Sequence, residues 1–389
     1  MGVDNVSWYD YGLDLRRNLD DLVRRLRSNS YHARYVKRKY IPKLNGKMRP
    51  LGIPALEDKI VQYAVSKNLE AIFEQEFEPI SYGYRPKVGA LTAVQDLTFE
   101  LQFGIYGYIV EADIKGFFDN IDHEKLIKML SLKIRDKAFL ALIQKWLKAG
   151  ILDTDGKVIH PVTGTPQGGI VSPILANIYL HYGLDNWFQK VVKKKCKGRA
   201  FIVRYADDFV AGFQFNEDAE KYYAELGDRL GKFGLQVEPS KTQKLRFSRF
   251  VPDIGEQFEF LGFSFQWRTD KSGKPRVVRT TMKKKFKASC ASFAEWIKKN
   301  RSKPIPDLMK TLKSKLQGYW NYYGLHGNSL MLNSFFKEVL YLSWKWLNRR
   351  SQRKSYTLKD LVKLLKQYKI PWPRITETPS PKRKAFLWN

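Results

Sequence analysis

Cysteine and histidine are rare in this sequence of 389 residues, which contains only Cys196, Cys290 and five scattered histidines. Two cysteines so far apart exclude a disulfide framework and a cysteine-based zinc site, and their scarcity suits the cytoplasm. The sequence also lacks any run of about 18 apolar residues that could span a bilayer. Its first residues include acids and no apolar stretch, unlike a secretory signal. We therefore expect a cytoplasmic protein without a membrane partner.

Acidic residues are few, because 39 Asp and Glu stand against 69 Lys and Arg and leave a net charge of +30. The imbalance is concentrated in the 122 residues from Arg268 onward, which hold 30 basic and 6 acidic residues, a surplus of +24. The first 267 residues then carry only +6. Charge of this density repels itself unless a polyanion is bound, and the phosphates of nucleic acid are the natural partner. A basic face that is simply solvated is the alternative explanation.

The spacing of hydrophobic residues predicts a mixed fold in the first two thirds of the chain. An amphipathic helix is indicated by four leucines at helical spacing, Leu15, Leu19, Leu22 and Leu26. Asn45-Gly46 lies between alternating residues and predicts the tight turn of a β-hairpin within 37–54. Residues 106–114 form an apolar, β-rich run that predicts a buried strand. Further helices are expected over 58–78, 123–149, 172–190 and 216–233.

The last third of the chain is expected to be basic and mostly helical. Residues 257–267 (QFEFLGFSFQW) predict another short hairpin, and the polar, basic composition of 268–282 predicts a linker. Beyond it, residues rich in Lys and Trp follow a helical pattern until Pro371-Trp372-Pro373 ends it.

Three acidic residues stand next to runs that require burial. Asp113 lies at the end of the run 106–114, and Asp207 and Asp208 stand between two β-rich runs within 201–213. Adjacent like charges near a core are destabilising unless a cation neutralises them. Carboxylate oxygens are the ligands that Mg²⁺ prefers. The alternative is a hairpin turn that uses the Asp-Asp pair for backbone hydrogen bonds.

Seven motifs follow one another along the chain: IPKLNGKMRPLGIP (41–54), SYGYRP (81–86), DIKGFFDNID (113–122), TPQGGIVSPILANIYL (165–180), RYADDF (204–209), GLQVEPSKT (234–242) and FLGF (260–263). In this order they resemble the reverse transcriptase and maturase proteins encoded by group II introns, over nearly the whole chain. The resemblance implies an α+β, right-hand polymerase, with fingers and palm built of an antiparallel sheet packed with helices, followed by an α-helical thumb. It implies that Asp113, Asp207 and Asp208 are catalytic and bind metal, with the backbone carbonyl of Ile114 as a further ligand. Two Mg²⁺ ions would be held there, with Mn²⁺ able to substitute.

The same resemblance assigns five residues to the incoming dNTP: Lys43, Arg49, Phe118, Gln167 and Lys241. Lys43 and Arg49 lie on the basic hairpin where the family's fingers hold the triphosphate, and Phe118 lies where a bulky ring excludes a 2′-hydroxyl. Gln167 matches a contact to nucleotide and template, beside glycines that permit close approach of the backbone to a ligand. Lys241 matches the lysine that protonates the leaving pyrophosphate. The alternatives are ordinary surface charges, a plain core ring for Phe118 and a simple turn at Gln167.

The expected domains are fingers over 1–105, palm over 106–267 with part of 123–200 returning to the fingers, a linker over 268–282, a thumb or maturase-specific X domain over 283–375, and a basic tail over 376–389. Nucleic-acid contacts are expected from six thumb cations, Lys283, Lys284, Lys285, Lys287, Arg349 and Arg350. The endonuclease that often follows the thumb in this family is not expected here, and the extension before Gly2 is expected to be short or absent.

The sequence therefore predicts an RNA-directed DNA polymerase that extends a DNA or RNA primer with dNTPs on an RNA template. It also predicts binding of a group II intron RNA, to assist splicing and retrohoming, in the cytoplasm of a bacterium. One alternative is an RNA-dependent RNA polymerase, against which Phe118 and the fingers segment argue. Another is a splicing cofactor with little or no polymerase activity, against which the intact set of three aspartates argues. A third is the same enzyme recruited to phage defence or a CRISPR locus. The oligomeric state is not predicted.

Overall fold

The computed structural model describes residues 1–42, 46, 48–165, 168–252, 255–350 and 355–378. The chain divides into two compact units, Met1–Ala93 with Tyr108–Lys244, and Val94–Gly107 with Leu245–Asn389. This division differs from the expected palm boundary at residue 267. The reason is local packing, because the ring of Phe247 lies 5.1 Å from that of Phe258 and 5.9 Å from that of Trp267. The hairpin expected at 257–267 therefore belongs to the second unit.

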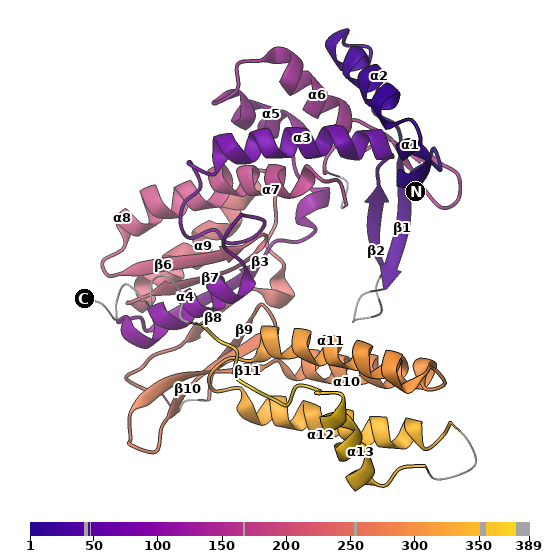
Figure 1. Ribbon diagram of the computed structural model, residues 1–389. Helices are drawn as coiled ribbons and strands as arrows, with labels where there is room; N and C mark the ends of the chain where they lie inside the picture. Colours follow the sequence, from indigo (N-terminus) through magenta and orange to yellow (C-terminus); the bar gives the residue numbers. More distant parts are fainter. Residues whose placement is uncertain (43–45, 47, 166–167, 253–254, 351–354, 379–389) are drawn as a thin grey trace. The chain divides into compact units, whose positions relative to one another are not determined.

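A four-stranded sheet in the order β6-β7-β3-β8 forms the centre of the first unit (Figure 1). Its strands are β3 (Tyr108–Asp113), β6 (Ala200–Tyr205), β7 (Asp208–Phe213) and β8 (Gln243–Arg246). β3 and β6 each pair antiparallel with β7. β7 is the central partner and its residues from Phe209 to Phe213 are buried, which matches their apolar character. The strand expected over 106–114 is confirmed.

Helices and sheet of the first unit share one hydrophobic core. The helices are α3 (Leu56–Phe73), α5 (His123–Ser131), α6 (Lys137–Leu147), α7 (Ser172–Leu180) and α9 (Asn216–Gly231). The helix expected over 123–149 is in fact two helices, because the Asp136 carboxylate accepts from the amides of Ala138 and Phe139 and starts a new helix there. After α7 the helical path continues in two π-helical turns, His181–Asp185 and Phe188–Val192, and in α8 (Lys193–Lys195).

A second sheet of the first unit contains the basic hairpin. Its strands are β1 (Val36–Pro42), β2 (Met48–Ile53), β4 (Ile151–Leu152) and β5 (Val158–Ile159), in the order β2-β1-β4-β5. β1 and β2 are antiparallel, with Lys37 opposite Ile53 and Pro42 opposite Met48. The hairpin expected around Asn45-Gly46 is confirmed, although Lys43 and Asn45 lie outside the described residues.

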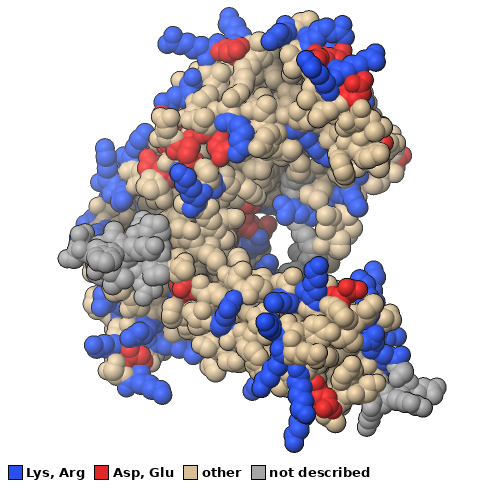
Figure 2. Space-filling view, in the orientation of Figure 1, with Lys and Arg blue, Asp and Glu red and all other residues tan. Residues whose placement is uncertain are grey.

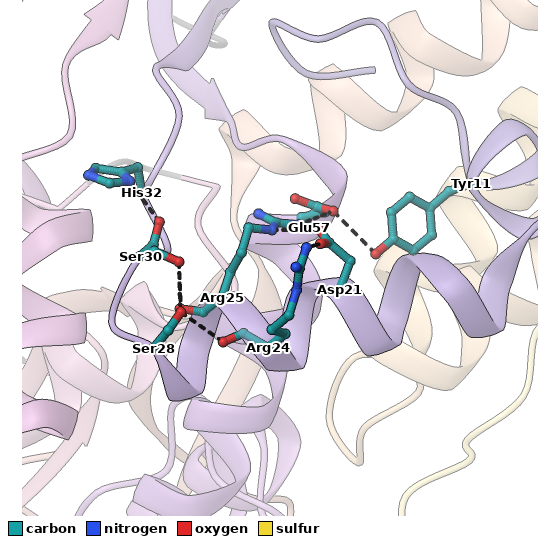
Figure 3. Close-up of polar contacts among 8 residues, drawn as sticks. All are labelled: Tyr11, Asp21, Arg24, Arg25, Ser28, Ser30, His32 and Glu57. Atoms are coloured by element: carbon teal, nitrogen blue, oxygen red, sulfur yellow. Dashed lines mark hydrogen bonds and ion pairs between the residues drawn. The ribbon is translucent and has the colours of Figure 1, made fainter.

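The N-terminal helices α1 (Trp8–Gly12) and α2 (Leu15–Arg27) are joined to α3 by polar contacts, which Figure 3 shows. Arg25 donates to Asp21 on its own helix at 2.7 Å and to Glu57 of α3 at 2.8 Å. Glu57 also accepts from the Tyr11 hydroxyl at 3.4 Å. Of the four leucines that predicted α2, only Leu22 is fully buried. The helix is thus confirmed, and an ion pair supplements its thin apolar face.

The second unit begins within α4 (Ala90–Phe103) and contains a three-stranded antiparallel sheet in the order β11-β10-β9. The strands are β9 (Gln257–Phe260), β10 (Phe263–Thr269) and β11 (Pro275–Thr281). The linker expected over 268–282 was wrong, because β10 and β11 pair along their whole length. The Asp270 carboxylate accepts from the amides of Ser272 and Lys274, which closes the turn between the two strands.

Four helices complete this unit, α10 (Lys283–Asn300), α11 (Ile305–Tyr323), α12 (Ser329–Leu347) and α13 (Leu358–Gln367). They confirm the helical pattern expected after residue 282. Their core centres on Trp320, which is fully buried, and on the ring of Tyr319 stacked 3.9 Å from that of Phe335. Throughout the described part of the chain, no helix is both long and apolar enough to cross a membrane.

Candidate active site

The two central strands of the first unit bring three aspartates into one neighbourhood. Asp113 ends β3 and Asp208 begins β7, and the register places them opposite each other. Directly opposed residues of an antiparallel pair have Cβ atoms about 5 Å apart. Asp207 lies in the two-residue turn that connects Tyr205 to Asp208. The three residues expected to be catalytic therefore meet at one end of the sheet.

The negative charges of these carboxylates are poorly compensated. Burial raises the pKa of Asp207, and the charge of Asp113 raises it further. Burial also raises the pKa of Asp208 well above its usual range, with repulsion from Asp113, Glu111 and Asp207. A divalent cation would relieve this repulsion, and hard carboxylate oxygens are suitable ligands for it. Among the described residues, no group of three or more His, Cys, Asp or Glu side chains converges closely enough to hold a metal ion. The donor set fits a metal by its chemistry, and the two-ion site stays a prediction.

Lys241 lies directly beside these acids. It ends the short 3₁₀ helix Pro239–Lys241, and its ammonium group forms an ion pair with the Asp113 carboxylate. Burial opposes its charge, but the bond to Asp113 and the charges of the three aspartates outweigh burial and raise the pKa of Lys241. The backbone holds this segment in place, because the Glu238 amide donates to the Asp113 carbonyl at 2.8 Å and Ile114 forms a bridge with Val237. The lysine predicted to protonate pyrophosphate is thus next to the acids, with a proton on its Nζ.

Phe118, the expected steric gate, follows Asp113 in the 3₁₀ helix Phe117–Asp119. Its ring is buried, with 8% exposed, and lies edge-to-face with Phe117 at 5.5 Å and with Tyr84 at 6.5 Å. Phe117 is more deeply buried, at 2%. Phe118 is therefore largely a core ring with one exposed edge, and its role as the gate stays a prediction.

Tyr84 is a residue of this site that the sequence reasoning missed. Its ring lies 6.4 Å from that of Tyr205, immediately before the turn that carries Asp207. Burial and the charge of Asp207 raise the pKa of Tyr84. Its φ of 56° is in the left-handed region, where a non-glycine residue is strained. The SYGYRP motif was the available signal, but it does not indicate which of its residues approaches the acids.

Of the residues expected to hold the dNTP on the hairpin side, Arg49 lies on β2 and is exposed. Its positive charge is among those that lower the pKa of Asp207 against the larger effect of burial. Lys43 and Gln167 lie outside the described residues. Gly168 has a φ of 117°, and a Cβ added there would lie 2.4 Å from the Gly52 carbonyl oxygen. This glycine thus permits close contact with β2, whereas the sequence suggested close contact with a ligand.

Comparison with known proteins identifies the family. Residues 41–265 match the family described as reverse transcriptase (RNA-dependent DNA polymerase). Residues 283–365 match the group II intron, maturase-specific domain. The chain belongs to the group II intron reverse transcriptase and maturase family. All three aspartates lie inside the first match, and α10 to α12 lie inside the second.

Two relatives of this family member cover most of its length. It is 29% identical to the group II intron-encoded protein LtrA of Lactococcus lactis subsp. cremoris, over 95% of this chain and 73% of the relative. It is 32% identical to protein YkfC of Escherichia coli (strain K12), over 77% of this chain and 84% of the relative. A solved structure of telomerase from Candida albicans matches with a TM-score of 0.50 at 13% identity, over 91% of this chain and 66% of that one. This likeness concerns the fold alone and supports the right-hand polymerase architecture.

In this reverse transcriptase family member, the expected thumb cations are exposed. Lys283, Lys284, Lys285 and Lys287 stand on the first turns of α10, where the helix dipole disfavours positive charge. Arg349 lies over the ring of Trp346 at 5.3 Å, and Arg350 donates to the Lys303 carbonyl at 2.8 Å. Figure 2 shows Lys and Arg side chains spread over the visible face of α10 to α12, with few acids among them. These cations are available to phosphate, and their contacts with nucleic acid stay a prediction.

Proposed function

We propose that this chain is an RNA-directed DNA polymerase that extends a primer 3′-hydroxyl with dNTPs on an RNA template. The observation that supports it most directly is the meeting of Asp113, Asp207 and Asp208 at one end of β3 and β7. A pure RNA-binding surface would not gather acids, since RNA phosphate is negative.

The reaction forms a bond between the primer 3′-oxygen and the α-phosphorus and breaks the bond to the β-phosphate, so that pyrophosphate leaves. Two Mg²⁺ ions, held by the three aspartates and the Ile114 carbonyl, would activate the hydroxyl and neutralise the developing charge. Arg49, with Lys43, would bind the triphosphate, for which a guanidinium fork and an ammonium are suited. Lys241 would donate its Nζ proton to the leaving pyrophosphate. Phe118 would close the space beside the sugar 2′-carbon.

Primer extension on an RNA template tests this proposal. Wild-type protein with dNTPs and Mg²⁺ should extend the primer, whereas Asp207→Asn should reduce the rate to background. Asp228→Asn is the matched control, because Asp228 is an exposed aspartate on α9 of the same unit. Extension with NTPs alone would instead support an RNA polymerase. A wild type that fails to extend while folded would contradict the proposal.

A second function is favoured by the match of residues 283–365 to the maturase-specific domain and by the surplus of +24 from Arg268 onward. We propose that this part binds a group II intron RNA and assists its splicing. Splicing of an intron RNA at physiological Mg²⁺, measured with wild type and Asp207→Asn, separates the two functions. Equal splicing by both proteins would assign splicing to RNA binding and polymerisation to the aspartates.

A further inference from the structure

A buried arginine lies directly behind the turn that carries Asp207. Arg204 is fully buried on β6, two residues before Ala206. All five N–H groups of a guanidinium are donors, and here each has an acceptor. The Arg204 network consists of Arg204 with Asp185, Asn177 and Ser81, and all four residues are at most 1% exposed.

The contacts of this network are specific to each nitrogen. Nε and one Nη2 hydrogen go to the two oxygens of Asp185, at 2.7 and 2.5 Å, and the other Nη2 hydrogen goes to the Ser81 hydroxyl at 2.7 Å. Nη1 donates to Asn177 Oδ1 at 3.2 Å and to the backbone carbonyl of Ala206 at 3.0 Å. That carbonyl belongs to the peptide that joins Ala206 to Asp207. The guanidinium therefore fixes the peptide plane from which the Asp207 side chain projects.

The turn needs such support, because Ala206 has a φ of 56°. A non-glycine residue in this region is strained, and it keeps that conformation only when its surroundings over-determine it. A second contact comes from Gly83, whose added Cβ would lie 2.5 Å from the Ala206 amide nitrogen. Asn177 binds both sides, since its Nδ2 donates to the Gly83 carbonyl at 2.6 Å. The same network thus holds the turn by its carbonyl and supports the segment that presses on its amide.

We propose that Arg204 is a positioning residue that holds the Ala206–Asp207 peptide so that the Asp207 carboxylate faces Asp113 and Asp208. The proposal rests on the proposed polymerase function for its consequence but not for its geometry. A lysine at this position would keep the charge that pairs with Asp185. It would lose the planar fork, because an ammonium cannot reach Asp185, Ser81, Asn177 and the Ala206 carbonyl together. A purely structural ion pair would tolerate this change; a positioning role would not.

The test measures metal binding apart from catalysis. Tb³⁺ prefers oxygen ligands, and Tyr84 and Tyr205 lie near the aspartates, where they can sensitise its luminescence. Wild type should bind Tb³⁺ in competition with Mg²⁺, and Asp207→Asn should lose that signal. Arg204→Lys should raise the half-saturating Tb³⁺ concentration about ten- to a hundred-fold, the usual effect of removing a support of a metal ligand. In primer extension it should lower kcat by a similar factor and leave KM for dNTP within about twofold.

The matched control is Arg279→Lys, the same substitution at a buried arginine of the second unit that pairs with Glu377. It should lower Tm, as Arg204→Lys does, without weakening the Tb³⁺ signal. Asn177→Ala is the second test variant, because it leaves the Arg204–Asp185 pair intact and frees the nitrogen that holds Ala206. It should also weaken Tb³⁺ binding, and it decides the question if Arg204→Lys does not fold.

Three results would overturn the inference: wild-type Tb³⁺ binding by the folded Arg204→Lys variant (or, where that variant does not fold, by Asn177→Ala), losses in all variants that merely follow Tm, or no difference between wild type and Asp207→Asn. A wild type that binds Tb³⁺ but never extends a primer would instead refute the polymerase proposal and leave the role of Arg204 standing.

Discussion

The stability of the second unit should depend on the ionised carboxylate of Glu377. This side chain is 3% exposed and accepts from both ends of the Arg279 guanidinium, at 2.8 and 3.0 Å. The backbone amide of His326 donates to it as well, at 2.8 Å. Burial alone would raise the pKa of Glu377, but the Arg279 and His326 bonds outweigh it and lower the pKa to about 2.

The sign and size of the effect follow from linkage. Because the folded pKa lies below the unfolded value of 4.5, the stabilisation is complete above pH 4.5 and is lost as pH falls toward 2. Each pKa unit corresponds to about 1.4 kcal/mol, so the full contribution is about 3 kcal/mol. By pH 3.5 the unfolded carboxyl is mostly protonated and the folded one is not, which removes about 1.4 kcal/mol of that contribution.

The assay is urea unfolding of wild type and Glu377→Gln between pH 7 and 3.5, followed by tryptophan fluorescence. Most tryptophans lie in the second unit, including the fully buried Trp320. The variant should be less stable at pH 7, and the difference from wild type should shrink by about 1.4 kcal/mol at pH 3.5. Other acids titrate in both proteins and cancel in the difference. A difference that stays constant with pH would refute the assignment of the stability to the charge of Glu377.

Three further outcomes are expected. Phe118→Ala should admit NTPs in primer extension, whereas Phe117→Ala, which should cost a similar 3–5 kcal/mol or so of stability, should not; equal NTP use by both would exclude Phe118 as the gate. Gly168→Ala should impair folding or activity, since its Cβ would meet the Gly52 carbonyl at 2.4 Å and its φ of 117° is strained for alanine, and a normal Tm with normal extension would contradict this. Replacing the four lysines on the first turns of α10 with glutamine should weaken RNA binding and make it less salt-dependent, by up to about 0.7 in the log–log slope per lost phosphate contact on a single strand; an unchanged slope would show that these lysines do not contact phosphate.

The sequence predicted the elements whose signals are local. The β-rich run up to Asp113, the Asp207-Asp208 pair between two apolar strands and the turn at Asn45-Gly46 all follow from neighbouring residues. The helices after residue 282 follow from their periodicity. Ordered motifs then sufficed to bring the three aspartates into one expected site.

What the sequence did not predict depends on contacts between distant residues. The bond from Arg204 to Ser81 joins positions 123 residues apart, and nothing near RYADDF indicates that its arginine is buried. β11 was missed because its basic side chains resemble those of a solvated linker, although Val277 and Val278 alternate into a paired strand. The boundary at residue 244 was missed because it depends on ring packing around Phe247.

The second unit is assembled from two pieces of chain, Val94–Gly107 and everything from Leu245 onward. On a ribosome that adds about 5–20 residues per second, the first piece would wait roughly 7 to 30 seconds before its partners are synthesised. During that interval the latter part of α4, with apolar residues such as Leu97 and Leu101 that are buried in the finished fold, has no native surface to cover it. The first unit, by contrast, is complete once Lys244 has emerged. Birth of this protein is therefore sequential, and the thumb-side helices cannot be moved to another polymerase as a simple C-terminal cassette.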